Sequence, residues 1–130
     1  MKNTPPRVLI LDSDVDALPP LRRLLLDRGC RVETCSSPGA AIQHVVNVMP
    51  DAVLTSIGFQ GYTGLEIVRR LRKGSPRSWI IVMAPLDDCP SLWEAADAGA
   101  DAIVSKPPQD EEVLRRLHDI LEGQNVMAVP

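Results

Sequence analysis

The chain has 130 residues with a formal net charge of −3, and 45% of the residues are hydrophobic. This length fits one domain of ordinary size, and the apolar fraction is large enough to build a core. The weakly acidic balance, with basic residues scattered singly or in pairs, argues against direct binding to nucleic acid or to an acidic membrane surface. The sequence predicts neither a membrane span nor a signal peptide.

Five predicted strands alternate with five predicted helices. In chain order, each strand followed by its helix, they are residues 7–11 and 18–28, 31–35 and 38–49, 52–56 and 64–73, 79–83 and 87 or 88 to 98, and 102–105 and 108–121. We expect residues 1–6 to form a loose arm and residues 123–130 a tail or the start of a linker. The sequence therefore predicts a single domain whose core comprises residues 7–122.

Local signals fix most of these boundaries. Pro19 and Pro20 are tolerated only in the first turn of their helix, and Gly29 ends it. Thr63 and Glu66 have the spacing of a capping box, which predicts a helix beginning just after Thr63. The strands are apolar throughout, as burial on both faces requires, so the alternation predicts a parallel α/β sheet covered by helices on both sides.

In parallel α/β folds, ligands and chemistry lie at the carboxyl ends of the strands. The polar residues predicted there are Asp12, Ser13, Asp14, Ser56 and Lys106. An acidic pair beside a lysine is typical of a site for a metal ion and an anion. Polar strand ends without any function are also found in every α/β protein, and the residues taken alone favour that simpler interpretation.

Four stretches resemble the receiver domain of two-component response regulators, over residues 8 to about 121. They are Val8 to Asp14, Pro50 to Glu66, Trp79 to Ala84 and Gly99 to Pro107. The last is the most specific, since it joins a Gly-Ala helix stop to an apolar strand that ends in Lys-Pro. The resemblance implies a flavodoxin-like (βα)5 receiver fold with strand order 2-1-3-4-5 and a cis bond before Pro107.

The family's functional positions fall on a changed set of residues. Its phosphoacceptor aspartate is Ser56, its acidic pair is Asp12 and Ser13, and its lysine is kept as Lys106. Its hydroxyl residue at the end of the fourth strand is Ala84, and its switch aromatic on the fifth strand is Ile103. The resemblance therefore keeps the fold signature and loses most of the phosphotransfer chemistry.

These changes lead us to expect a degenerate phosphorylation site with no catalytic residue. Mg²⁺ prefers about six oxygen ligands, several of them anionic, and here only Asp12 remains of three carboxylates. We expect weak Mg²⁺ binding or none, although Asp14 or Asp16 could replace the missing acid. We expect Lys106 to form a structural ion pair with Asp12 rather than to serve catalysis.

Three functions follow as hypotheses. The favoured one is an atypical receiver, not an enzyme, that signals by protein–protein contact without phosphorylation. The alternatives are a phosphotransfer receiver with a non-standard acceptor and a small-ligand-binding flavodoxin-like domain. The last predicts a pocket at the carboxyl edge of the sheet, lined by Ile57, Phe59 and Pro85.

Receivers of this family use the face of the fourth helix, fifth strand and fifth helix to bind a partner or to form a homodimer. Here that face would present Ile103, with Leu92 or Trp93 beside it and Arg115 and Arg116 at the rim. The alternative is that Ile103 fills the space of an inward aromatic. For Trp93, helical spacing with Cys89 and Ala96 favours core packing over a binding role.

The cysteines Cys30, Cys35 and Cys89 are odd in number and form no CxxC pair. They favour free thiols in a cytoplasmic, reducing compartment over a disulfide framework or a zinc site. We expect them to pack in the core as small hydrophobic residues.

Overall fold

The structure is a computed structural model that describes residues 4–121 except 86, 88 and 107. The elements are β1 (Arg7–Leu11), α1 (Leu18–Leu26), β2 (Arg31–Cys35), α2 (Pro38–Val48), β3 (Ala52–Ser56), α3 (Gly64–Gly74), β4 (Trp79–Ala84), α4 (Cys89–Ala98), β5 (Ala102–Ser105) and α5 (Asp110–Leu121). The five strands are parallel, in the order β2-β1-β3-β4-β5. The predicted fold is confirmed.

Several helix ends differ from the prediction by one or two residues, among them the end of α1 and the start of α5. α1 ends at Leu26 because residues 27–29 tighten into turns, in which the N–H groups of Arg28 and Gly29 donate to carbonyls three residues back. α5 begins at Asp110 rather than at 108, with three acidic residues in its first turn. Acidic side chains there interact favourably with the positive end of the helix dipole. The predicted capping box of Thr63 and Glu66 is present at the start of α3.

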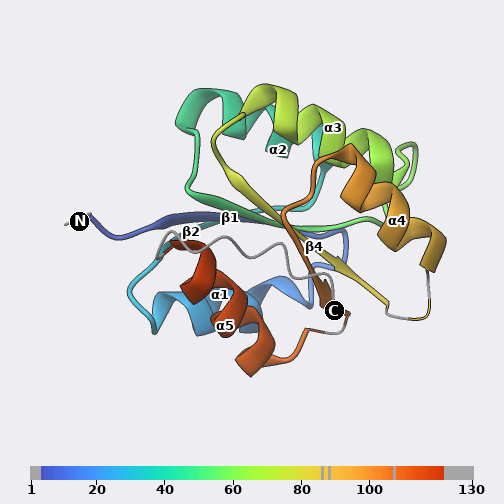
Figure 1. Ribbon diagram of the computed structural model, residues 1–130. Helices are drawn as coiled ribbons and strands as arrows, with labels where there is room; N and C mark the ends of the chain where they lie inside the picture. Colours follow the sequence, from blue (N-terminus) through green and yellow to red (C-terminus); the bar gives the residue numbers. More distant parts are fainter. Residues whose placement is uncertain (1–3, 86, 88, 107, 122–130) are drawn as a thin grey trace.

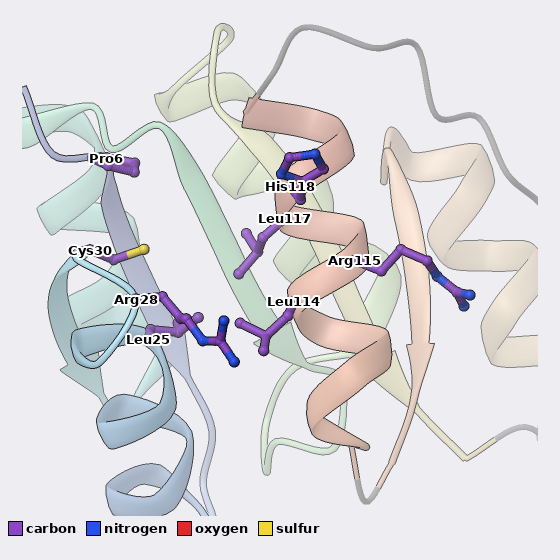
Figure 2. A pocket seen from close by; sticks show the side chains of 8 residues that line it. All are labelled: Pro6, Leu25, Arg28, Cys30, Leu114, Arg115, Leu117 and His118. Carbon is purple, nitrogen blue, oxygen red and sulfur yellow. The ribbon is translucent and has the colours of Figure 1, made fainter. Parts of the chain in front are cut away.

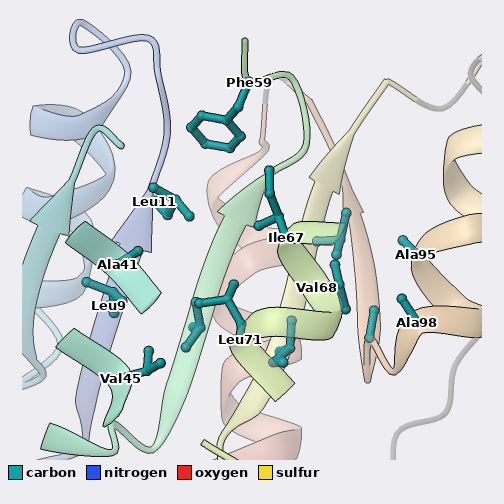
Figure 3. Packing of buried hydrophobic residues seen from close by; sticks show 14 of the residues in the cluster. Leu9, Leu11, Ala41, Val45, Phe59, Ile67, Val68, Leu71, Ala95 and Ala98 are labelled. Carbon is teal, nitrogen blue, oxygen red and sulfur yellow. The ribbon is translucent and has the colours of Figure 1, made fainter. Parts of the chain in front are cut away.

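The helices cover both faces of the sheet (Figure 1). On one face α2, α3 and α4 enclose a core that includes Leu9, Val53, Ile67, Leu71 and Ala95 (Figure 3). On the other face α1 and α5 cover a second core that includes Ile10, Leu25, Leu54, Val104 and Leu117. No described helix has both the length and the apolar character needed to cross a bilayer.

A half-buried polar clamp lies at the end of the sheet at which β4 and β5 begin. Arg72 on α3 donates to the carbonyls of Ser78 and Gly99 at 2.6 and 2.7 Å and to Asp101 Oδ2 at 2.5 Å. The same carboxylate oxygen accepts the N–H of Ile80 at 2.8 Å. One side chain thus ties α3 to the starts of two neighbouring strands. The candidate site described below lies at the other end of these strands.

Candidate functional site

The predicted site residues meet at the carboxyl edge of the sheet. Asp12 directly follows β1, Ser56 and Ala84 end β3 and β4, and Lys106 directly follows β5. Asp12, Ser56 and Ala84 are buried. The N–H of Lys106 donates to the Ala84 carbonyl at 3.0 Å, which anchors the end of β5 beside β4. The parallel register therefore brings together four residues that are far apart in sequence.

The Lys106 ammonium is the centre of this arrangement. Its Nζ donates to Oδ1 and Oδ2 of Asp12 at 2.9 and 2.7 Å and to Oγ of Ser56 at 2.8 Å. The expected ion pair of Lys106 with Asp12 is thus present, and Ser56 joins it. An ammonium has three donors, so these three acceptors account for all of them.

The two residues after Asp12 do not enter the cluster in the same way. The Ser13 hydroxyl donates to the Gly58 carbonyl at 3.1 Å, so it ties the loop after β1 to the loop after β3. Asp14 and Asp16 are exposed, and each backbone N–H donates to a carboxylate two residues earlier. Within the described residues, no three His, Cys, Asp or Glu side chains are grouped to hold a metal ion.

A pocket of about 390 Å³ opens beside the cluster. It is lined by Ser56, Ile57, Gly58, Gly64, Met83, Pro85 and Lys106. Two of the three apolar residues expected for a ligand pocket, Ile57 and Pro85, are in its wall. Phe59 is not, because its side chain is buried in the core on the face of the sheet that α2, α3 and α4 cover (Figure 3).

The face of α4, β5 and α5 is only partly as expected. Trp93 on α4 is 69% exposed, so the prediction that it packs in the core is wrong. Helical spacing alone could not tell which side of α4 faces the sheet, and Ala95 and Ala98 occupy that side. Ile103 is half-buried and packs against the core under α4. The side chain of Leu92 and the bond before Pro107 lie outside what the structure describes.

The cysteines are less buried than predicted. Cys30 and Cys35 are free thiols, and both are half-buried at the margins of the two cores. Burial raises the pKa of both thiols, and the nearby Glu33 carboxylate also raises the pKa of Cys35. Neither lies in the cluster around Lys106, and the side chain of Cys89 is outside the described part.

Two hydrogen bonds at the carboxyl edge of the sheet could not be predicted from the sequence. The Gly58 carbonyl that accepts from Ser13 is a backbone group, for which sequence gives no signal. The hydrogen bond from Lys106 to Ser56 depends on strand register, which brings the ends of β3 and β5 to either side of β4. The pattern of polar residues after apolar strands was the only available signal, and it located the edge correctly.

The chain is similar in sequence to known response regulators. The model of the response regulator receiver domain matches residues 8–118. The response regulator MprA of Mycobacterium sp. strain KMS is 33% identical over 117 residues, which are 90% of this chain and 51% of MprA. The transcriptional regulatory protein KdpE of Mycobacterium tuberculosis is 34% identical over 110 residues, which are 85% of this chain and 48% of KdpE.

Among solved structures, a putative response regulator from Chloroflexus aurantiacus is similar, with a TM-score of 0.84 and 25% identity. That similarity covers 92% of this chain and 99% of the other. The chain spans about half the length of the curated relatives that it matches.

Proposed function

This chain belongs to the family of response regulator receiver domains, and on that premise we propose that it is an atypical receiver that signals by protein contact without being phosphorylated. Receiver domains act in two-component signal transduction. What we propose beyond family membership is that this receiver signals without phosphorylation. This proposal rests on one observation, the triple hydrogen bonding of the Lys106 ammonium to Asp12 and Ser56.

The chemistry at position 56 supports the proposal. A serine hydroxyl becomes an effective nucleophile only when a base accepts its proton. Among the described residues, the Ser56 hydroxyl is hydrogen-bonded to Lys106 alone, and an ammonium has no lone pair to accept a proton. The residue at the end of β4 is Ala84, which cannot hydrogen-bond to a phosphoryl group. We therefore propose that the domain does not catalyse its own phosphorylation.

The Mg²⁺ that family members use does not fit the residues at this edge. Both carboxylate oxygens of Asp12 already accept from Lys106, and Oδ1 also accepts the N–H of Asp14. The two other acidic positions of the family are Ser13 and Ser56. A divalent cation would have to displace the half-buried Lys106 ammonium and would gain only one carboxylate. We propose that Mg²⁺ is bound weakly or not at all.

The partner surface in this proposal is the face of α4, β5 and α5. An indole that is 69% exposed is costly to leave in water and is typical of the centre of protein interfaces. The partner is a second copy of the chain or another protein. The free thiols of Cys30 and Cys35 fit a reducing compartment such as the cytoplasm.

The test is exposure to acetyl phosphate with Mg²⁺, followed by intact-mass spectrometry. We expect no mass gain for the natural chain. The double variant Ser13→Asp, Ser56→Asp restores the family's carboxylates and should gain about 80 Da, the mass of one phosphoryl group. A stoichiometric gain by the natural chain that disappears in Ser56→Ala would overturn the proposal in favour of a serine phosphoacceptor.

A further inference from the structure

A second hollow, of about 460 Å³, lies between α1 and α5 at the end of the sheet opposite to Ser56 (Figure 2). It is lined by Pro6, Leu25, Arg28, Cys30, Leu114, Arg115, Leu117 and His118. Pockets that bind small molecules measure about 300–1,000 Å³, so this hollow has the size of a ligand site. The cluster of Asp12, Ser56 and Lys106 lies at the opposite end of the strands, and none of its residues lines this hollow.

The floor of the hollow is part of the protein core. Leu25 and Leu117 are buried members of the core beneath α1 and α5, and Leu114 and Cys30 pack against it. In Figure 2 the side chains of Leu114 and Leu117 point from α5 toward α1. Leu25 and Leu117 are only 0% and 3% exposed, so an apolar group in the hollow would contact chiefly the half-buried side chains of Leu114 and Cys30, which packing already holds in place.

The rim is basic. Arg28, Arg115 and His118 line the hollow, and none of the described lining residues is acidic. Figure 2 shows the Arg28 side chain reaching from the turn after α1 toward α5, whereas Arg115 points away. Arg28 makes no ion pair within the described residues, although Arg23 on α1 pairs with Asp27 at 3.3 Å. The charge facing the apolar floor is thus an arginine with no carboxylate partner among the described residues.

We propose that this hollow binds a small anionic amphiphile, with an apolar body of about ten carbon atoms on the leucine floor and a carboxylate on Arg28. Arginine and carboxylate form charge-assisted, often bidentate hydrogen bonds. A second copy of the chain is a poorer occupant, because a symmetric contact would bring two basic rims together. The inference goes beyond the proposed function and holds whether or not Ser56 accepts a phosphoryl group.

Isothermal titration calorimetry with decanoate, below its micelle concentration, tests the site. We expect one saturable site with a Kd below about 1 mM, the range of a small ligand with one good ion pair. Decyltrimethylammonium has the same tail and the opposite charge, and it should bind at least about tenfold more weakly because it lacks the ion pair with Arg28.

Matched variants locate the site. Arg28→Gln should weaken decanoate binding about tenfold or more, and Arg23→Gln, on α1 and outside the hollow, should leave it unchanged. Both side chains are exposed, so the two substitutions should not impair folding.

Decanoate should also slow alkylation of Cys30 but not of Cys35. Burial raises the pKa of both thiols, so this experiment is run at alkaline pH. A Kd of 1 mM or more, equal binding of the two surfactants or indifference to Arg28→Gln would overturn the inference.

Discussion

The Lys106 ammonium lies 2.7 Å from Oδ2 of Asp12, whose side chain is only 3% exposed. A buried carboxylate that loses its partner is strongly destabilising, because its desolvation is no longer compensated. Lys106→Met should therefore lower the free energy of unfolding by about 3 kcal/mol, as measured by urea denaturation.

The double variant Asp12→Asn, Lys106→Met separates charge from packing. It removes both charges and leaves an amide oxygen that can still accept the N–H of Asp14. We expect it to be more stable than Lys106→Met alone. A loss below about 0.5 kcal/mol for Lys106→Met would mean that solvent reaches the Asp12 carboxylate and that the pair is not structural.

Magnesium affinity is the second prediction. The natural chain should bind Mg²⁺ with a Kd in the millimolar range or weaker, because Asp12 is the only carboxylate of the family's set and Lys106 holds it. Ser13→Asp with Ser56→Asp should tighten binding by at least about tenfold, since each carboxylate adds charge in a partly desolvated site. Calorimetric titration measures both. Tight binding by the natural chain would show that Asp14 or Asp16 reaches the metal.

The clamp made by Arg72 gives a prediction about stability. Arg72→Ala removes hydrogen bonds to the Ser78 and Gly99 carbonyls and to Asp101, and leaves these acceptors at the starts of β4 and β5 with fewer donors. The expected loss is about 3 kcal/mol by urea denaturation. Arg23→Ala is the control, because the Arg23 and Asp27 side chains are 80% and 64% exposed. It should cost at most about 0.5 kcal/mol. Equal effects of the two variants would contradict the clamp.

The sequence predicted the fold well because the signals for it are local. Five apolar runs separated by amphipathic segments fix the alternation, and Thr63 with Glu66 places the start of α3 correctly. Several helix ends were missed by one or two residues; at the end of α1 turns replace the last predicted helical residues, and before α5 residues 108–109 have no regular structure. There the free-energy difference between helix and turn is small, and tertiary packing decides.

The site was predicted less completely for a geometric reason. Polar residues after strands identified Asp12, Ser56 and Lys106 as neighbours, because parallel strands share one carboxyl edge. Which way a side chain turns depends on three-dimensional packing, so the contact of Ser13 with Gly58 and the exposure of Trp93 were beyond reach. The clamp of Arg72 was missed because its acceptors include the backbone carbonyls of Pro76, Ser78 and Gly99.

The last prediction concerns the face of α4, β5 and α5. Trp93→Glu places a charge at the centre of the proposed interface, where desolvating it opposes association. Because Trp93 is 69% exposed, the thermal midpoint should stay nearly unchanged. Sedimentation velocity over a concentration series should show self-association of the natural chain that the variant loses. Val46→Glu, on α2 and outside this face, is the matched control, since Val46 is 56% exposed.

Ile103→Glu distinguishes packing from recognition on the same face. Ile103 is half-buried against the core under α4, so a carboxylate there should lower the thermal midpoint as well as weaken association. A natural chain that stays monomeric at every concentration would rule out the homodimer and leave the face to a different protein. If the natural chain self-associates and Trp93→Glu does so equally well, the contact lies elsewhere, and the assignment of α4, β5 and α5 as the working surface is wrong.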